Sequence, residues 1–361
     1  MKKIVILGGA RDFHAMDWYR AVQKNAPKNE VIFLTDLIGG EGYDNLLVPT
    51  DDIEKLFIID KFLCSKQSTF GNIWRNLLKL LVLPIQICKL KKFHQKNPDC
   101  IYHAHPMYYM FLCWLSGIEY IGSPQGDEIL IRPHRSWLYR YFAVKVLRTA
   151  KFVIVDSQNM QKEIKKLSGV DALVHQYGID IDELQKYNNK KQKTKVASIR
   201  GMLPLYRIHK ILESRSHSVP ADPIHFIYPY YEESYSKSIK QQMLDSDVDL
   251  GRLNKQEMYS LLSESYLAVS IPESDSSPRS VYESIFLGCC VAIEHNPYLD
   301  TLPMCMKERV VVVDLDDKYW FGDAVKKACE ITKVGYFPSE EAINMFDQNL
   351  SIRRVIGKLY V

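Results

Sequence analysis

The sequence predicts an α/β protein made of two doubly wound, Rossmann-like domains. Short runs of β-branched and aromatic residues alternate with segments of helical periodicity along the chain, which is typical of βαβ units and parallel sheets. The length of 361 residues exceeds that of a usual single hydrophobic core. A lysine-rich segment with few apolar residues, 185–195, is expected to link the two domains.

The expected strands follow one another regularly on both sides of this linker. In the first half they are 3–8, 30–35, 55–59, 99–103, 119–123, 152–156 and 173–177, and in the second half 195–199, 224–228, 247–249, 266–271, 289–294 and 309–313. The first domain is therefore expected at residues 1–182 and the second at 194–339.

The composition is that of a globular protein, with 47% hydrophobic and 25% charged residues. The eight cysteines are scattered without the paired spacing of a metal site. The apolar run after Lys3 is too short for a secretory signal and is expected to form the first strand. These features predict reduced thiols, no bound metal and a cytoplasmic location.

Basic residues gather in the first half of the chain. Residues 61–96 hold eight lysines and arginines and no acid, and residues 132–151 also lack acids. Within the first stretch, apolar residues follow helical spacing: Trp74, Leu77, Leu78, Leu81 and Ile85. Such a helix either lies on an anionic membrane or packs on the core with a solvated basic face, and the second basic stretch slightly favours the membrane. No nucleic-acid-binding motif is present, so no nucleic acid partner is expected.

The turn between the strand at 266–271 and the helix that begins after Pro278 is the strongest candidate site. In open α/β sheets, ligands bind at the carboxyl ends of strands, and the free N–H groups of a helix start attract phosphate or sugar oxygens. Two carboxylates bracket this turn, Asp275 before the helix and Glu283 within it. An ordinary capped helix with Asp275 as a turn residue is the alternative.

The segment Asp275-Ser-Ser-Pro-Arg-Ser-Val-Tyr-Glu283 resembles the donor-site motif of retaining, metal-independent glycosyltransferases with the GT-B fold. Within that class it is similar to family four, and there to members that build bacterial surface polysaccharides. The resemblance implies two Rossmann-like domains facing a cleft, with a last helix at about 340–361 crossing back to the first domain. It also implies that the residues of this motif bind the nucleotide-sugar donor.

By this resemblance, Asp275 holds hydroxyls of the donor sugar and Glu283 holds the ribose of the nucleotide. The backbone near three further residues faces the sugar and diphosphate: Ser276, Ser277 and Arg279.

Cations for the diphosphate are expected after the strand at 195–199. Arg200 matches the first cation of the family. Leu205 occupies the spacing of the second, so Arg207 would have to serve from a shifted position. The loop containing Gly251 and Leu253 is similar to the one that reads the nucleotide base.

Acceptor-side candidates come from the first domain. Gly8 and Gly9 follow the first strand and are followed by His14, but no third glycine opens the helix, so the dinucleotide fingerprint is not matched. His103 and His105 share one side of a strand end. The resemblance implies that such a histidine contacts sugars, and a structural hydrogen-bonding role is the alternative. Asp127 or Glu128 is expected either to bind acceptor hydroxyls or to cap a helix.

The expected activity is transfer of a sugar from a nucleotide-sugar, UDP- or GDP-linked, to a glycan or glycolipid acceptor such as O-antigen, capsule or exopolysaccharide. The expected catalytic residues are His105, Asp275 and Arg200. No cofactor is expected, and the resemblance implies a metal-independent transfer. The protein is expected at the inner face of the cytoplasmic membrane or free in the cytoplasm. Two alternatives are a nucleotide-sugar 2-epimerase of the same fold and a non-catalytic Rossmann-like binding protein.

Overall fold

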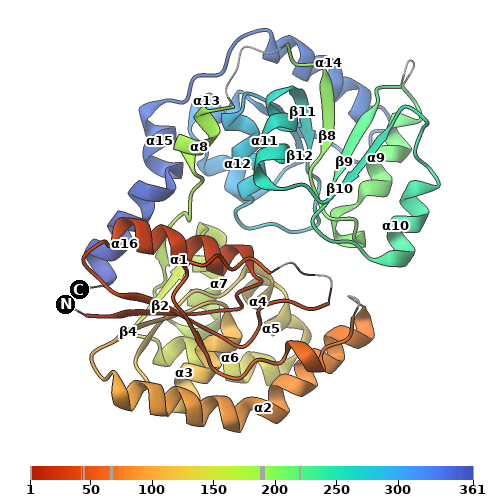
Figure 1. Cartoon of the computed structure of the whole chain (residues 1–361). Helices are drawn as coiled ribbons and strands as arrows, with labels where there is room; N and C mark the ends of the chain where they lie inside the picture. The colour runs from red at the N-terminus through yellow and green to blue at the C-terminus, as the bar shows by residue number, and fades with distance from the viewer. Residues whose placement is uncertain are drawn as a thin grey trace. The chain divides into compact units, whose positions relative to one another are not determined.

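The computed structural model describes residues 2–41, 43, 45–65, 68–187, 192–218 and 221–360. The chain divides into two compact units (Figure 1). Unit 1 is Met1–Tyr177 with Asn349–Val361, and unit 2 is Gly178–Gln348. Each unit contains one parallel sheet with helices on both faces.

Unit 1 contains a seven-stranded sheet in the order β3-β2-β1-β4-β5-β6-β7. Its strands are β1 Ile4–Leu7, β2 Val31–Thr35, β3 Ile53–Lys55, β4 Ile101–Ala104, β5 Tyr120–Gly122, β6 Phe152–Val155 and β7 Leu173–Val174. Its helices are α1 Phe13–Asn25, η1 Asp60–Phe62, α2 Thr69–Lys96, α3 Met107–Ser116, α4 Gly126–Leu130, α5 Arg132–Arg135, α6 Trp137–Thr149, α7 Gln158–Ser168 and the C-terminal α16 Gln348–Leu359.

Alternation along the strands of unit 1 builds two separate cores. Val5 and Leu7 of β1 face the core that includes residues of α2, α3, α6 and α7. Ile4 and Ile6 face the opposite core, which α1 and α16 cover. Because every second side chain points to the same side, the strands are apolar on both faces, as a buried parallel sheet requires.

Unit 2 contains a six-stranded parallel sheet in the order β10-β9-β8-β11-β12-β13. Its strands are β8 Lys195–Ser198, β9 Ile224–Ile227, β10 Val248–Gly251, β11 Ser265–Val269, β12 Cys290–Glu294 and β13 Val310–Val313. Its helices are α8 Ile181–Gln185, η2 Pro204–Tyr206, α9 Ile208–Arg215, α10 Glu233–Lys240, α11 Lys255–Ser263, α12 Arg279–Phe286, η3 Pro297–Thr301, α13 Met304–Lys307, α14 Trp320–Thr332 and α15 Glu340–Phe346.

Both sheets reverse their winding direction at one point. In unit 1 the chain winds outward from β1 to β3 and then resumes on the other side of β1 with β4. In unit 2 the same reversal separates β8 from β11. In sheets of this kind, the loops that leave the two central strands diverge at such a point, and ligands bind between them at the carboxyl edge. These two switch points are where a ligand site is expected in each unit.

Each strand expected from the sequence overlaps one in the structure, and three details differ. The strand expected at 55–59 ends at Lys55, because Leu56 and Ile59 are buried in a loop instead. The last segment forms two helices, α15 in unit 2 and α16 in unit 1. The expected linker contains residues 188–191, which lie outside the described residues.

The division between the units falls at Gly178. Its φ is 73°, and a Cβ there would lie 2.6 Å from the carbonyl oxygen of Phe346. Only glycine combines that backbone conformation with so close an approach. Ile179 N donates to Phe346 O at 2.7 Å and Gln348 N donates to Ile179 O at 3.0 Å, so the two chain connections between the units run side by side.

Helix α2 turns two of its basic residues inward, whereas one of the two interpretations of the sequence expected a solvated basic face. Lys79 points inward, where its ammonium lies 3.3 Å from Asp36 and 3.8 Å from the centre of the Tyr108 ring. Arg75 pairs with buried Glu41 at 3.0 Å. Residues 66 and 67 of the basic stretch lie outside the described part of the chain. None of the described helices has the length and apolarity needed to span a bilayer.

Candidate active site

Arg200 and Asp275 meet at the switch point of unit 2. Arg200 follows β8, Asp275 follows β11, and these two strands are neighbours in the sheet. The guanidinium of Arg200 forms an ion pair with the Asp275 carboxylate, and its Nε donates to Ser270 Oγ at 2.7 Å. Both charged side chains are mostly buried. The sequence prediction that these residues share one site is thus consistent with the geometry, and Ser270 is an additional partner that it missed.

The loop from β11 to α12 is folded around Asp275. Ser276 N donates to Asp275 Oδ1 at 3.0 Å, and Asn296 Nδ2 donates to the Asp275 carbonyl at 3.4 Å. Pro278 occupies the N-cap of α12 without a side-chain cap. The first turn of α12 starts with Arg279 and contains no acid. An uncapped helix start beside Arg200 suits an anion.

Glu283 lies inside α12 and is only 5% exposed. Tyr259 of α11 donates its hydroxyl to Glu283 Oε1 at 2.8 Å. Ser277 and Tyr282 hydroxyls, 3.2 Å apart, connect the loop to the same helix. Tyr259 therefore fixes the orientation of the Glu283 carboxylate, and this partner was not found from the sequence.

Arg207 binds backbone carbonyls of the β11–α12 loop. Its Nε donates to the Ile271 carbonyl at 2.8 Å, one Nη donates to the Pro272 carbonyl at 3.0 Å, and the same nitrogen lies 2.5 Å from Glu294 Oε2. A guanidinium with these three partners holds the β11–α12 loop in place. The sequence suggested that Arg207 binds the diphosphate from a shifted position. In the structure its guanidinium is engaged by these loop carbonyls and by Glu294.

Gly251 and Leu253 lie at the carboxyl end of β10, the edge strand of unit 2. Gly251 has a φ of 60° and its carbonyl accepts from Tyr228 N at 2.8 Å. The structure places this loop on the same edge of the sheet as Arg200, separated from β8 by β9.

Tyr298 is a further residue that sequence reasoning missed. Its hydroxyl is buried and has no hydrogen-bond partner among the described residues. Burial raises its pKa well above the usual value, and the nearby Tyr282 and Asp275 add to the shift. A buried hydroxyl without a partner beside Asp275 is available to a ligand group. No motif signalled it, because it follows β12 in a short 3₁₀ turn.

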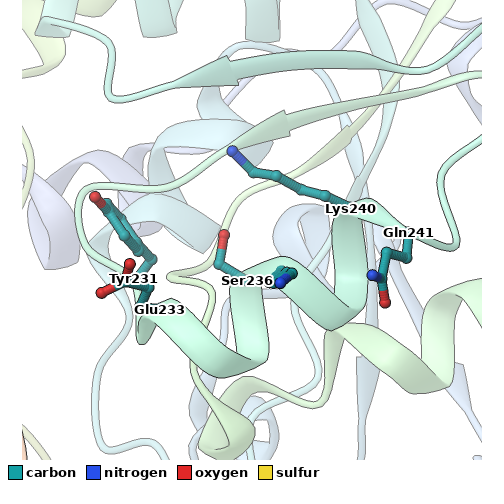
Figure 2. Close-up of a pocket in the computed structure, with 6 residues that line it drawn as sticks. Tyr231, Glu233, Ser236, Lys240 and Gln241 are labelled. Atoms are coloured by element: carbon teal, nitrogen blue, oxygen red, sulfur yellow. The ribbon is translucent and has the colours of Figure 1, made fainter.

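A hollow of about 490 Å³ lies over α10 and the turn before it (Figure 2). Tyr231, Glu233, Ser236, Lys237, Lys240 and Gln241 line it. Lys240 Nζ pairs with Asp249 at 2.7 Å, at the outer edge of the sheet. The hollow is therefore distinct from the switch point between β8 and β11.

At the switch point of unit 1, the Gly8–Gly9 loop meets the end of β4. A Cβ on Gly8 would lie 2.8 Å from Ala15 Cβ and 3.3 Å from the His105 carbonyl, so only glycine allows this approach. Gly9 lies against Tyr109, whose hydroxyl would be 3.6 Å from a Cβ there. The loop is thus packed directly against the end of β4, where His105 follows the strand.

His103 of β4 and His105, which directly follows this strand, have different surroundings. His103 is fully buried, with Nδ1 2.5 Å from Tyr360 Oη and Nε2 2.7 Å from Ser123 Oγ. His105 is 6% exposed, and its Nε2 has no hydrogen-bond partner among the described residues. The rings lie 4.2 Å apart. The sequence suggested that His103 faces an acceptor. Its ring is instead held by Tyr360 and Ser123 and packs against the ring of His105.

The remaining candidate residues of unit 1 lie at the starts of α1 and α4. Asp12 caps α1 by accepting from His14 N at 3.0 Å, and Gln125 Nε2 donates to its other oxygen at 3.2 Å. His14 itself is exposed. Glu128 accepts from Gln125 N at 3.0 Å in a capping box. Asp127 forms an exposed pair with Arg132 at 2.6 Å. Of the two roles expected for these residues, Glu128 has the helix-capping one, whereas the Asp127 side chain is exposed to solvent.

Burial keeps three histidines of unit 1 uncharged. It lowers the pKa of His105 to about 3 and that of His175 to about 4, and it lowers the pKa of His103 well below the usual value. The Glu128 pKa is raised by burial to about 7. His105 can therefore donate or accept a hydrogen bond as a neutral ring at physiological pH, but it carries no proton to spare as an acid.

We expect the stability of unit 1 to fall as pH is lowered from 6.5 toward 4. The unfolded chain then binds protons at three histidines that the folded unit leaves uncharged. Glu128 acts in the opposite direction between pH 7 and 4.5, because the folded state binds its proton first. Urea unfolding across this interval tests the balance, and His105→Asn should reduce the slope. A midpoint that rises with acidity would contradict it.

Side-chain chemistry at both switch points suits anions and hydroxyl groups better than metals. No group of three His, Cys, Asp or Glu side chains that could hold a metal ion occurs in the described ranges. Arg200, Ser270, Asp275 and the start of α12 form a compact set of donors and one carboxylate.

Comparison with solved structures decides the fold. HepE of Anabaena in complex with UDP and glucose matches with a TM-score of 0.73 and 14% identity over 100% of this chain and 99% of that one. The chain has the GT-B fold. Sucrose-phosphate synthase from Thermosynechococcus elongatus matches at 0.75 and 12%, covering 100% and 98%. AviGT4, a glycosyltransferase involved in avilamycin A biosynthesis, matches at 0.61 and 10%, covering 100% and 97%.

The GT-B fold accounts for the paired parallel sheets described above. No protein-family model matches the chain. No curated protein matches its sequence either. At 10–14% identity the similarity establishes architecture, and the activity has to be argued from the site itself.

Proposed function

We propose that this GT-B protein is a retaining, metal-independent glycosyltransferase that transfers a sugar from a nucleotide-sugar to a glycan acceptor. The observation that carries the proposal is the buried Arg200–Asp275 pair beside the uncapped start of α12, at the switch point of unit 2. It provides one cation, backbone donors and one carboxylate within a single loop. These groups suit a diphosphate and the hydroxyls of its attached sugar.

The donor is proposed to be a UDP-sugar, with GDP-sugars as the second choice. HepE, which has the same fold, was solved with UDP and with UDP-glucose. Glu283, held by Tyr259, is proposed to accept hydrogen bonds from the ribose. The loop at Gly251 and Leu253 is proposed to contact the base, because it lies on the same carboxyl edge.

Binding of the donor would exchange the partners of Arg200. In the structure its guanidinium is neutralised by Asp275. A diphosphate carries more negative charge and matches the forked guanidinium in geometry. We expect the diphosphate to draw Arg200 away from Asp275, whose oxygens then accept hydrogen bonds from the sugar hydroxyls. Arg207 keeps the loop in position during this exchange through the Ile271 and Pro272 carbonyls.

In the proposed reaction, the bond between the sugar C1 and the diphosphate oxygen breaks and its electron pair leaves with the diphosphate. Arg200 and the amides of the helix start stabilise that charge. The acceptor oxygen forms its bond to C1 on the same face, and its proton passes to the departing phosphate. Neutral His105 is proposed to orient the reacting hydroxyls by a hydrogen bond from its unpartnered Nε2 side.

The acceptor is proposed to be a lipid-linked surface glycan of the O-antigen, capsule or exopolysaccharide type, reached from the cytoplasmic side of the membrane. Support comes from the resemblance at 275–283 and from the absence of acids in α2. Unit 1 is proposed to bind this acceptor near His14, Asp127 and the Gly8–Gly9 loop.

The donor is tested by a thermal-shift screen of UDP-, GDP-, dTDP- and CMP-sugars. A ligand at 100 times its Kd stabilises by about 2.7 kcal/mol, which is measurable. The stabilising sugar is then incubated with the protein and a lipid-linked acceptor. Transfer with retained anomeric configuration supports the proposal. Interconversion of the nucleotide-sugar at C2 without an acceptor would identify an epimerase, and stabilisation by none of them would refute the donor site.

We expect EDTA to leave transfer largely unchanged. Arg200 and the start of α12 already supply positive charge for the diphosphate, so no divalent cation is required. The measurement is the initial rate of nucleotide release with EDTA and with added Mg²⁺ or Mn²⁺. Loss of activity in EDTA, restored by either ion, would contradict the metal-independent mechanism.

A further inference from the structure

The outward side of α2 is apolar. Six large apolar side chains of this helix are exposed: Phe70, Ile73, Leu77, Leu80, Leu81 and Ile85. Leu81, for example, is 64% exposed. The inward side carries the buried residues Leu78, Val82, Gln86 and Leu90. From residue 73 to 85 the apolar side extends for about 18 Å along the helix. A helix that is apolar on its solvent side usually has a partner there.

Helices α3 and α6 extend this surface. Phe142 of α6 contacts Phe111 and Trp114 of α3, with ring centres 6.4 and 6.3 Å apart. α3 also packs against α2, and Figure 1 shows the three helices on the side of the unit 1 sheet opposite α1. Exposed apolar side chains on α3 and α6 are Leu115, Trp137, Leu138, Tyr141 and Phe142, and Trp137 is 81% exposed. We call the exposed apolar residues of α2, α3 and α6 the outer face.

The charged residues of these three helices are all basic. None of the three helices contains an aspartate or glutamate. Exposed basic residues flank the apolar ones: Lys89, Lys91, Lys92 and Lys96 on α2, and Arg140 and Lys145 on α6. Among the described residues none of these six pairs with a carboxylate, unlike the inward-pointing Arg75 and Lys79.

We propose that the outer face docks on a lipid bilayer containing anionic lipids, with its apolar side chains inserted and its lysines at the headgroups. Exposed apolar residues next to unpaired lysines match the two layers of a membrane interface. Trp137 and Tyr141 have the amphipathic rings that concentrate at that depth. Each flanking lysine contributes attraction that salt screens, while the apolar contact persists in salt.

Positive charge distinguishes this partner from a second copy of the chain. Two outer faces in contact would bring their lysines together without carboxylates to pair them, which disfavours a symmetric dimer. A bilayer supplies both the hydrocarbon and the phosphates that these side chains lack.

The inference deepens the membrane-linked part of the proposed function. It identifies a surface and an insertion mode that do not depend on the sugar donor. The test therefore measures lipid binding by the whole chain, and the thermal shift with a UDP-sugar is recorded separately for each variant. Failure of flotation with the UDP-sugar shift retained refutes docking alone, whereas loss of that shift in the wild type refutes only the donor assignment.

The experiment is flotation with vesicles of phosphatidylglycerol and phosphatidylcholine, compared with phosphatidylcholine alone. The apolar variant carries Leu77→Gln, Leu81→Gln and Ile85→Gln, and its matched control in unit 2 carries Met304→Gln, Val334→Gln and Phe337→Gln, which are similarly exposed. Glutamine is a good helix former, so α2 should stay folded. The charge variant is Lys89→Gln, Lys91→Gln, Lys92→Gln, with Lys326→Gln, Lys327→Gln as its control.

We expect the wild type and both controls to float with anionic vesicles, and the apolar variant to lose at least about tenfold in binding at low and high salt. The charge variant should lose binding mainly at low salt. Wild-type protein that stays unbound, or an apolar variant that floats like the wild type, would overturn the proposal. So would a concentration-dependent dimer, seen by sedimentation without lipid, that the apolar variant abolishes.

Discussion

Replacing Arg200 by glutamine is expected to lower sugar transfer by about a hundredfold to a thousandfold. Glutamine keeps a donor for Ser270 but removes the charge that faces Asp275 and, in the proposed complex, the diphosphate. Arg200→Lys should recover only part of the loss, because an ammonium cannot contact Ser270 and two phosphate oxygens through one planar fork. Steady-state rates and Kd for UDP give the two readouts.

Loss of a buried charge also destabilises, so a matched control is needed. Arg215 pairs with Asp247 at 2.5 Å in the same unit, and its side chain is even more buried than that of Arg200. Asp247 accepts from Ile224 N at the start of β9, which places this pair at the amino edge of the sheet, away from the switch point. Arg215→Gln should lower the unfolding midpoint while leaving the Kd for UDP unchanged in the folded protein. Equal effects of both variants on that Kd would remove Arg200 from the donor site.

The fold was predictable because local patterns and the global architecture agree. The central β-branched runs are short and apolar on both faces, so they mark strands of a doubly covered parallel sheet, and Val5 and Ile6 show both faces in use. The strand predicted at 55–59 was largely wrong, because the observed strand ends at Lys55. The apolar residues of that segment are buried in a loop, and burial alone does not distinguish a loop from a strand.

The site was predictable where neighbouring strands bring motifs together. Arg200 and Asp275 follow β8 and β11, and any parallel sheet with those neighbours places them at one edge. The partners of Arg207 and the burial of Tyr298 depend on loop conformation, which residue spacing does not determine. The hydrogen bond of His103 could not be predicted either, because its partner Tyr360 is 257 residues away in the sequence.

Helix α2 shows why periodicity cannot assign the direction of a face. Leu77, Leu78 and Leu81 recur at helical spacing, yet only Leu78 is buried. Lys79, expected on a solvated face, is buried beside Asp36, and its pKa is lowered by burial. The inward side of the helix thus contacts a buried carboxylate far away in the sequence, and no local pattern records that contact.

Substitutions at the two carboxylates of unit 2 should separate sugar binding from nucleotide binding. Asp275→Asn is expected to reduce transfer strongly while the Kd for UDP stays unchanged or falls, because Arg200 then loses the carboxylate that competes with the diphosphate. Glu283→Gln is expected to weaken both UDP and UDP-sugar by about tenfold, since hydrogen bonds to a charged group contribute about 1.5–3 kcal/mol. Isothermal titration with UDP and with the UDP-sugar gives the comparison.

The glutamine variant is chosen because alanine would leave the Tyr259 hydroxyl without its acceptor, at a cost of about 1–3 kcal/mol. Tyr259→Phe is the matched control: it removes the same 2.8 Å hydrogen bond but keeps the Glu283 charge, so it should perturb UDP binding less than Glu283→Gln. If UDP binds the folded Glu283→Gln variant as well as the wild type, Glu283 does not hold the ribose. If Asp275→Asn and Glu283→Gln lose UDP equally, the carboxylates do not divide the donor between sugar and nucleotide, and Asp275 acts on the nucleotide as well.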